Sequence, residues 1–352
     1  MSRKESLAFA GCFAVSSGLL IGCVPTFADD LSTVTAPRVL AIQSSPAEAA
    51  PGASVTLNAL VAAPDGAMAT LDWGLCTARK PLTELGPVNP DCLLPPGSDP
   101  DAGTLLGDGA SLNATLPADG CQIFGPIRPP AVAGQAQGRP VDPDVTGGYY
   151  QPITANLRAT NQVTLGAVRL TCPLTDATPA QLEAFDALYR PNQNPDFSAL
   201  NLEQAGGAVT AIVDGGSASV RPGEAVQFQA NWAECPTVSV CGDGICGENE
   251  DKSSCPADCA TATGCTGAET YPVFDATAQQ ITTQRESIRI SWYASGGTFQ
   301  NAVTGREETE TASDSENGWT APSAPGTVQL WLVIRDARGG QSFRSFSVSV
   351  QP

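Results

Sequence analysis

The sequence predicts an all-β protein built as two β-sandwiches in tandem, and three observations lead to this prediction. The chain of 352 residues is long enough for two domains of ordinary size. It holds 35 glycines and 29 prolines, an excess that suits many turns between short strands. Apolar and polar residues alternate over short runs, as in half-buried strands, and one such pattern occurs twice.

In each copy of the repeat, a strand, a Pro-Gly turn and an alternating strand precede a strand that carries a tryptophan. The matching segments are Val39–Ile42 with Val209–Ile212, Pro51–Ala59 with Pro222–Ala230, and Leu71–Trp73 with Ile290–Trp292. The arrangement resembles the opening of bacterial immunoglobulin-like and PKD-like domains, in which such a tryptophan packs between two sheets. The resemblance implies two tandem Ig-like sandwiches, with Trp73 and Trp292 in their cores rather than on a ligand-stacking surface.

We expect the first sandwich over 37–175, a helix and linker over 176–205, and the second sandwich over 206–352. The second copy of the repeat carries many more residues before its tryptophan than the first, and the cysteine-rich segment 235–265 lies among them. This segment is therefore predicted to be a disulfide-rich loop inserted into the second sandwich, and not a separate domain.

One short helix is predicted in the linker, over 178–189. Thr178 can cap it, Pro179 suits its first position, and Gln181 completes a capping box. Its apolar face would consist of Leu182, Phe185 and Tyr189.

The second sandwich should close with a hairpin of two strands, Thr327–Arg335 and Ser342–Val350. Strands are also expected in the first sandwich, at Ser111–Leu116, Tyr149–Ala159 and Gln162–Leu170. In the first strand of the hairpin, Trp331 and Val333 point away from the predicted core. Either a covered second face or a binding patch would explain these two residues.

Residues 1–22 have the pattern of a secretion signal, in which Arg3 and Lys4 precede an apolar run too short for a comfortable membrane span. The run ends in Leu-Ile-Gly-Cys23, which resembles the lipobox of bacterial lipoproteins. The resemblance implies cleavage before Cys23, acylation of that cysteine, and a lipidated tether over 23–36. Because residue 24 is valine and not aspartate, the resemblance also implies that the lipoprotein is sorted to the outer membrane. Ordinary cleavage near Ala28 is the alternative.

Apart from Cys12 and Cys23, ten cysteines remain, an even number as expected for an oxidised exported protein. Six are expected to form the disulfides Cys76–Cys92, Cys121–Cys172 and Cys235–Cys265, the last closing the neck of the insertion. The other four should pair among themselves in one of three ways: Cys241, Cys246, Cys255 and Cys259. A zinc site is the alternative for these four, but their spacing departs from paired Cys-x2-Cys motifs.

Five carboxylates of the insertion are candidate calcium ligands: Asp243, Glu248, Glu250, Asp251 and Asp258. Disulfides would compact this loop, and carboxylates held close together repel unless a cation offsets their charge. Oxygen ligands from a short loop suit calcium, although the order differs from that of an EF-hand. The alternative is that these side chains simply face water.

Composition excludes several classes of function. A net charge of −18 opposes binding to nucleic acid. The chain contains no histidine, which excludes Ser-His-Asp and Cys-His catalysis and histidine zinc sites. It also lacks the phosphate-binding and dinucleotide-binding glycine loops. We therefore expect that the protein is not an enzyme and that it binds no cofactor other than the candidate calcium ion.

The segment from Cys241 to Cys259 contains Cys-Gly-Asp-Gly-Ile-Cys and Cys-Pro-Ala-Asp-Cys. It resembles the cysteine-rich units that decorate Ig-like and PKD-like domains of myxobacterial surface lipoproteins. The resemblance implies an exported outer-membrane lipoprotein on the periplasmic or surface face, without naming an activity. We expect a non-enzymatic structural, adhesion or partner-binding role, with another surface protein or a polysaccharide as partner. The alternative is an accessory component, binding carbohydrate or peptide, of an extracellular hydrolase system.

Overall fold

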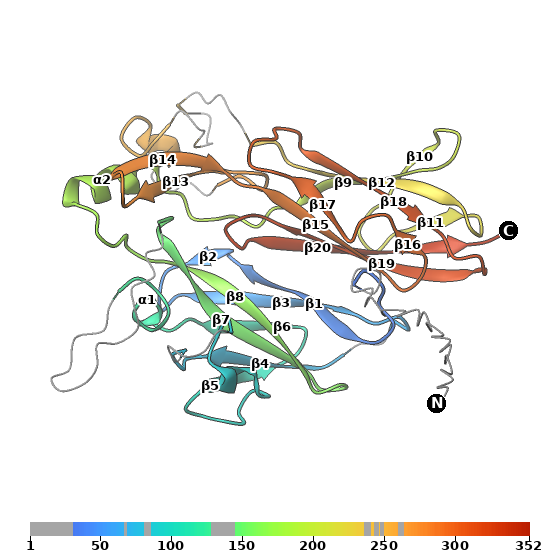
Figure 1. Ribbon diagram of the computed structural model, residues 1–352, viewed down its shortest axis with the longest axis horizontal. Coiled ribbons are helices and arrows are strands. Elements are labelled where there is room, and N and C mark those ends of the chain that lie inside the picture. Colours follow the sequence, from blue (N-terminus) through green and yellow to red (C-terminus); the bar gives the residue numbers. More distant parts are fainter. Residues whose placement is uncertain are drawn as a thin grey trace, which may run out of the picture.

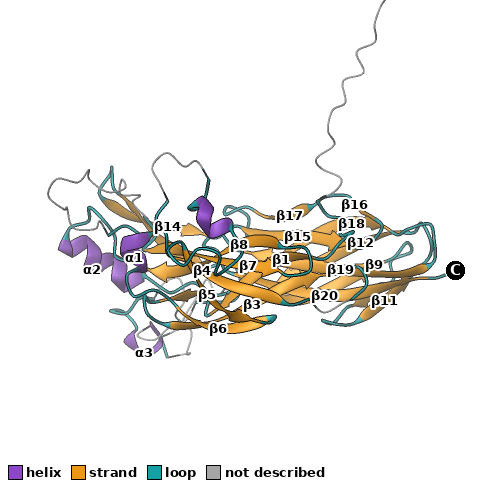
Figure 2. Ribbon diagram, turned by 90° about the horizontal axis from the view of Figure 1, so that it is seen from below, coloured by secondary structure: helices purple, strands orange, loops and turns teal. Residues whose placement is uncertain are grey.

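The computed structural model describes residues 31–66, 69–80, 86–127, 145–235, 241–242, 246, 250–259 and 264–352. These residues form two β-sandwiches that lie side by side (Figure 1). The described α-helices are short, and they gather at one end of the molecule (Figure 2). The predicted all-β class and the two sandwiches are confirmed.

The first sandwich packs a three-stranded sheet on a five-stranded sheet. In spatial order, the three-stranded sheet is β1 (Arg38–Ser45), β3 (Ser54–Ala62) and β6 (Ser111–Thr115). The five-stranded sheet is β2 (Glu48–Ala49), β8 (Gln162–Thr171), β7 (Gly148–Leu157), β4 (Leu71–Cys76) and β5 (Gly103–Asp108). Two short helices, η1 (Pro90–Leu93) and α1 (Gly120–Ile123), interrupt the connections. Strand alternation turns Leu57, Trp73 and Ile153 into the core, where all three are fully buried.

The second sandwich repeats this strand order and adds one strand at each edge of its first sheet. That first sheet is β10 (Val209–Ala211), β9 (Phe197–Glu203), β12 (Ala225–Trp232), β18 (Asp314–Thr320) and β16 (Thr298–Phe299). The second sheet is β11 (Ser217–Val220), β20 (Gln341–Val350), β19 (Gly326–Arg335), β15 (Ile288–Ala294) and β17 (Val303–Arg306). In both sandwiches a short strand pairs in parallel with the last strand, β2 with β8 and β11 with β20.

The two repeated tryptophans occupy equivalent places, on β4 and β15, and both are fully buried as predicted. Each indole satisfies its own N–H. Trp73 Nε1 donates to the Gly109 carbonyl at 2.8 Å, and Trp292 Nε1 donates to Thr304 Oγ1 at 2.9 Å. Each ring therefore fills a core without leaving its donor unpaired.

One part of the predicted repeat is wrong. Val209–Ala211 forms β10, an exposed edge strand of three residues, and it is not the counterpart of β1. The strand that pairs with β12 as β1 pairs with β3 is β9, so the second sandwich begins at Phe197 and not at 206. The short alternating run at 209–212 resembled β1 by pattern alone, whereas burial and pairing distinguish the two.

The outward-facing apolar residues of β19 are covered by the first sandwich. Trp331 and Val333 are buried and form one cluster with Leu40 and Ala62 from β1 and β3. Arg335 Nη2 also donates to the Leu40 carbonyl at 3.0 Å. Of the two explanations for this face, the covered second face is therefore the correct one.

The chain enters the first sandwich along a strand of the second. Thr33 forms a parallel bridge with Ala294 at the end of β15. The Val34 N–H donates to the Ala294 carbonyl at 2.8 Å, and the Ala294 N–H donates to the Ser32 carbonyl at 2.9 Å. The segment before β1 is thus attached to the second sandwich.

The linker helix is α2 (Pro179–Leu188), and its predicted capping box is present. The Gln181 N–H donates to Thr178 Oγ1, and the Thr178 N–H donates to Gln181 Oε1. Phe185 packs with Phe274 of a hairpin that the sequence analysis did not predict. This hairpin is β13 (Thr270–Asp275) and β14 (Gln280–Arg285), and it directly follows the insertion.

Candidate functional site

The ten cysteines form five disulfides, three of which lie in the insertion. Cys76–Cys92, Cys121–Cys172 and Cys235–Cys265 are the pairs that the sequence analysis favoured. The other four cysteines pair as Cys241–Cys255 and Cys246–Cys259, which selects one of the three open arrangements. A segment this short and polar has no core of its own, so cross-links hold its shape.

The neck of the insertion is closed by backbone as well as by the Cys235–Cys265 bridge. Ala233, directly after β12, forms a parallel bridge with Gly267. A Cβ at residue 267 would lie 2.0 Å from the Ala233 carbonyl oxygen, so only glycine allows this approach. The Asp196 N–H, just before β9, donates to the Thr266 carbonyl at 2.9 Å.

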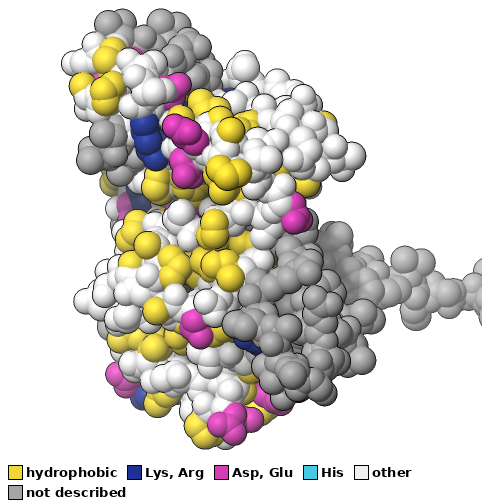
Figure 3. All heavy atoms as spheres, turned by 90° about the vertical axis from the view of Figure 1, so that its left-hand side faces the viewer, with side chains coloured by type: hydrophobic (Ala, Val, Ile, Leu, Met, Phe, Trp, Pro, Cys, Tyr) yellow, Lys and Arg dark blue, Asp and Glu magenta, His cyan; other side chains and the backbone are white. Residues whose placement is uncertain are grey.

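The insertion is also docked against α2 and the linker that follows it. Arg190 Nη2 donates to the Glu250 carbonyl at 2.5 Å, and its Nε lies 3.0 Å from Cys246 Sγ. The Lys252 N–H donates to the Ala187 carbonyl, in the last turn of α2, at 3.2 Å. These contacts fix the loop to the end of the molecule that carries the helices. In what Figure 3 shows of that end, charged side chains are few and form no large patch of one sign.

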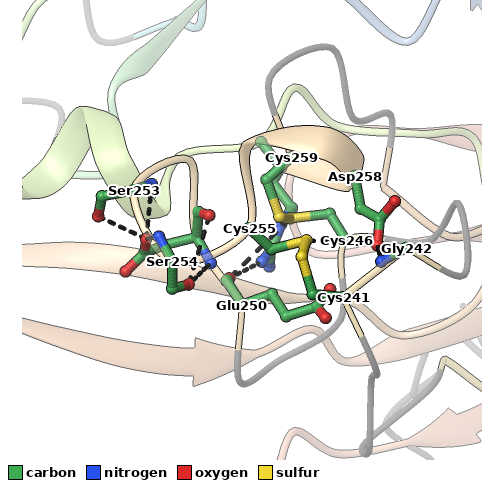
Figure 4. Close-up of a disulfide and its surroundings, with 11 residues drawn as sticks. Cys241, Gly242, Cys246, Glu250, Ser253, Ser254, Cys255, Asp258 and Cys259 are labelled. Carbon is green, nitrogen blue, oxygen red and sulfur yellow. Dashed lines mark hydrogen bonds between the residues drawn. A yellow bond between two sulfur atoms is a disulfide. The ribbon is translucent and has the colours of Figure 1, made fainter.

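Two of the candidate calcium ligands converge on the Cys241–Cys255 disulfide (Figure 4). Glu250 and Asp258 are both buried, and one potential ligand atom of each lies within 4.8 Å of the other and of both sulfurs. Asp258 Oδ2 accepts a hydrogen bond from the Gly242 N–H at 2.5 Å, which ties both ends of the loop together. Asp243 and Glu248 lie outside the residues that the structure describes.

Asp251 does not join this pair, because its carboxylate organises a turn. Its Oδ1 accepts from the hydroxyl and N–H of Ser253, at 2.6 and 2.7 Å, and from the Ser254 N–H at 2.6 Å. These hydrogen bonds, that of the Ser253 hydroxyl first, lower the pKa of Asp251 to about 2. The turn leads into α3 (Pro256–Cys259), which carries Asp258.

The donor set does not fit zinc. A zinc-bound cysteine must be a thiolate, and Cys241, Cys246, Cys255 and Cys259 are all oxidised in disulfides. The carboxylates of Glu250 and Asp258 are the described oxygen donors that converge, which is fewer than calcium requires. Calcium binding therefore stays a prediction that depends also on Asp243 and Glu248.

A buried polar junction connects the insertion, the linker and both sandwiches, and it centres on Arg338 in the β19–β20 hairpin. Its guanidinium donates to Glu269 Oε2 at 2.5 Å and to Glu286 Oε1 at 2.7 Å. Its Nη1 donates to the Arg190 carbonyl at 3.1 Å, in the same residue that holds the insertion. Glu269 lies just after the neck of the insertion, so its ion pair with Arg338 connects the neck to the β19–β20 hairpin.

A second buried ion pair lies on the first sandwich and reaches the same linker. Arg169 Nε donates to Glu48 Oε2 at 3.1 Å, and both side chains are almost completely buried. The same carboxylate accepts from the Tyr189 hydroxyl and from the Asn192 N–H, which belong to the linker. The linker is thus held by the first sandwich through Glu48 and by the second through Arg338.

Burial shifts the pKa values of the carboxyl groups in this junction. It raises the pKa of Glu269 and Glu286 above the usual carboxyl range, and the Arg338 guanidinium opposes this shift in both. Burial and the neighbouring Glu286 raise the pKa of Asp336 as well. Burial and the Glu48 carboxylate raise the pKa of Tyr189. Local patterns could not reveal this junction, because Glu48 and Arg169 are distant in sequence.

Disulfides of this number indicate an exported protein, since cytosolic thiols are kept reduced. Within the described ranges, the structure contains no helix with the length and apolar character of a membrane span. The predicted lipidation site, Cys23, lies outside the described residues.

No family model matches the sequence, and no curated protein matches it. Among solved structures, the fibronectin(III)-like modules of Clostridium thermocellum CbhA are 8% identical, over 90% of this chain and 94% of theirs, with a TM-score of 0.20. The Yersinia pseudotuberculosis adhesin InvE is 9% identical, over 88% of this chain and 58% of that chain, with a TM-score of 0.19. The C-terminal domain of the Streptococcus pyogenes antigen I/II-family protein AspA is 9% identical, over 89% and 99%, with a TM-score of 0.19.

The identities and TM-scores are low, and the strand pairing itself defines the two-sandwich architecture. Fold and site together define a class: an exported all-β protein of two Ig-like sandwiches with a disulfide-stapled insertion.

Proposed function

We propose that this chain is a non-enzymatic surface lipoprotein of the outer membrane, anchored through Cys23, that binds a partner with its stapled insertion. The observation that supports the proposal is that the described part of the insertion is held by two kinds of contact, disulfides and hydrogen bonds to α2 and the linker. The neck disulfide, two internal disulfides and the docking contacts of Arg190 and Lys252 hold it. A loop held in this way loses little conformational entropy when it binds, which favours affinity.

The partner we propose is another surface protein or a polysaccharide, and the proposed role is adhesion or envelope structure. The absence of histidine and of nucleophile motifs in the sequence supports a binding role over a catalytic one. The carboxylates of the junction support it too, because Glu48, Glu269 and Glu286 are buried in ion pairs with arginines.

The test is a cross-linking pull-down from intact cells with the lipid-anchored protein. The variant replaces residues 241–259 by a short Gly-Ser segment and keeps Cys235 and Cys265, so that the neck stays closed. The proposal expects one or more cross-linked partners with the wild type and their loss with the variant. Equal recovery by both would refute the insertion as the contact surface.

The anchor is tested separately. A fatty-acid analogue should label the wild type, and Cys23→Ser should lose both the label and the membrane fraction. A Cys12→Ser variant is the matched control and should retain both. Retention of label in Cys23→Ser would refute the proposed anchor and leave the binding test unaffected.

A further inference from the structure

The outer face of the sheet β10–β9–β12–β18–β16 carries a cavity of about 650 Å³, away from the insertion. Gln227 on β12 lies opposite Gly318 on β18, and the Gln300 N–H donates to the Gly318 carbonyl at 2.8 Å. Their strand neighbours Val226 and Trp319 are buried in the core. Because side chains alternate along a strand, Gln227 and residue 318 face outward into the cavity.

Residue 318, in the floor of the cavity, has no side chain, and two glutamine side chains reach over it. A Cβ there would lie 3.0 Å from Gln300 Oε1 and 3.5 Å from Gln227 Oε1, so two amide groups approach the same point above β18. Gly318 does not have the positive φ that requires glycine, so its backbone would accept another residue. Within the described ranges, neither glutamine side chain makes a hydrogen bond to protein.

The lining of the cavity selects the chemistry of a ligand. It contains no Lys or Arg and one carboxylate, Glu203, so it does not complement an anionic polymer. The hydroxyls of Thr298 and Thr320 add to the two amides, and Ala205 and Ala225 add apolar surface. Each amide can donate and accept at once, which matches the neighbouring hydroxyls of a sugar. The volume of the cavity lies within the usual range of about 300–1,000 Å³ for ligand sites.

A peptide matches this surface less well. Extended peptides usually gain affinity by adding a strand to an open sheet edge. Here the cavity lies on the face of β12 and β18, whose backbone groups are engaged with each other and with β9. The edge strand that also lines the cavity, β16, is two residues long and offers little backbone for such pairing. We propose that this cavity binds a neutral oligosaccharide, as a second site that goes beyond the partner-binding role of the insertion.

The experiment is calorimetric titration of the purified full chain with neutral cello-, chito-, malto- and manno-oligosaccharides, up to millimolar concentration. Two variants address the cavity: Gly318→Val places a side chain where the two amides converge and forces them to move, and the double variant Gln227→Ala/Gln300→Ala removes both amides. Gln229→Ala is the matched control, since Gln229 lies on the same face of β12 but outside the lining. A thermal melt of each variant verifies that it is folded.

We expect at least one of the four series to bind, with affinity at least tenfold weaker in both cavity variants and unchanged in Gln229→Ala. Absence of binding by all four series, or binding that Gly318→Val leaves intact, would overturn the proposal. Self-association of the wild type that Gly318→Val abolishes, without glycan binding, would assign the cavity to a second copy of the chain instead. The pull-down with the insertion variant is independent of every one of these outcomes.

Discussion

The two sandwiches share one strand order but are stabilised in different ways. The core of the second contains an aromatic cluster of Phe228, Trp292, Phe299, Trp319 and Phe346, with the centroids of its contacting rings 5.6–6.4 Å apart. In the main core cluster of the first sandwich, Trp73 is the one buried aromatic member among the described residues, and Cys121 and Cys172 belong to that cluster. The two sandwiches thus share a topology, but buried aromatic side chains fill the core of the second, whereas smaller side chains and a disulfide stabilise the core of the first.

The largest effect should come from the centre of the aromatic cluster. Phe228 is fully buried and contacts four other rings, so Phe228→Ala should lower the free energy of unfolding of the second sandwich by about 3–5 kcal/mol. Denaturant unfolding measures this. The neighbouring Gln229→Ala, on the outer face, should cost no more than about 0.5 kcal/mol. Similar costs for both would contradict the assignment of Phe228 to the core.

Removal of a disulfide should lower the stability of the first sandwich more than that of the second. The Cys121–Cys172 bridge closes a loop of 51 residues, which corresponds to about 4 kcal/mol in the chain-entropy treatment. The double variant Cys121→Ala/Cys172→Ala should therefore lower the melting transition of the first sandwich in calorimetry. Cys241→Ala/Cys255→Ala is the comparison, because that bridge lies outside both cores and should leave the main transition in place. The idea fails if the second pair lowers it as much as the first.

The junction between the sandwiches should make stability depend on pH. The pKa values of Glu269, Glu286 and Asp336 are raised in the folded state, so the folded protein holds protons that the unfolded chain has released. Below the ordinary carboxyl pKa of about 4 both states are protonated and these groups have no effect. As the pH rises from there through the raised pKa values, stability falls. The denaturation midpoint should therefore be higher at pH 5.5 than at pH 7.

The variant Asp336→Asn tests whether the pH dependence of stability comes from the junction or from general charge repulsion. Asp336 Oδ1 accepts from the Gly340 N–H at 2.8 Å, and asparagine can keep this hydrogen bond without titrating. Glu286 and Arg338 are the charged groups that act on Asp336 most strongly, and both remain. The variant should show a smaller difference between the two pH values than the wild type. An unchanged difference would exclude Asp336 as a source of it.

The smallest effect should come from the linker helix. Thr178→Ala removes the side chain that accepts from the Gln181 N–H and should cost about 1 kcal/mol. Thr178→Ser keeps the hydroxyl and is the control. Since α2 supports the insertion through Ala187, hydrogen exchange of the Lys252 amide should also become faster in the alanine variant. Equal exchange rates of the Lys252 amide in both variants would show that the helix does not support the insertion.

Local signals in the sequence predicted what local physics determines. The capping box at Thr178 and Gln181 is fixed by residue type and spacing. The burial of Trp73 and Trp292 is predicted from the resemblance to Ig-like domains, and the neck disulfide from the position of the insertion between two strands. The alternation at 209–212 misled, because a strand pattern does not tell which neighbour a strand pairs with. The junction of Glu48, Arg169, Glu286 and Arg338 gave no signal, since its members come from distant segments that meet only in three dimensions.

The attachment of Thr33 to Ala294 has a mechanical consequence. A tension applied at the N-terminal side of the chain, as an anchor would apply it, reaches residue 33 before β1. It is carried there by the hydrogen bonds between residues 32–34 and Ala294, which the parallel geometry loads in shear. These hydrogen bonds are therefore loaded before β1, so part of the tension passes directly to the second sandwich through β15.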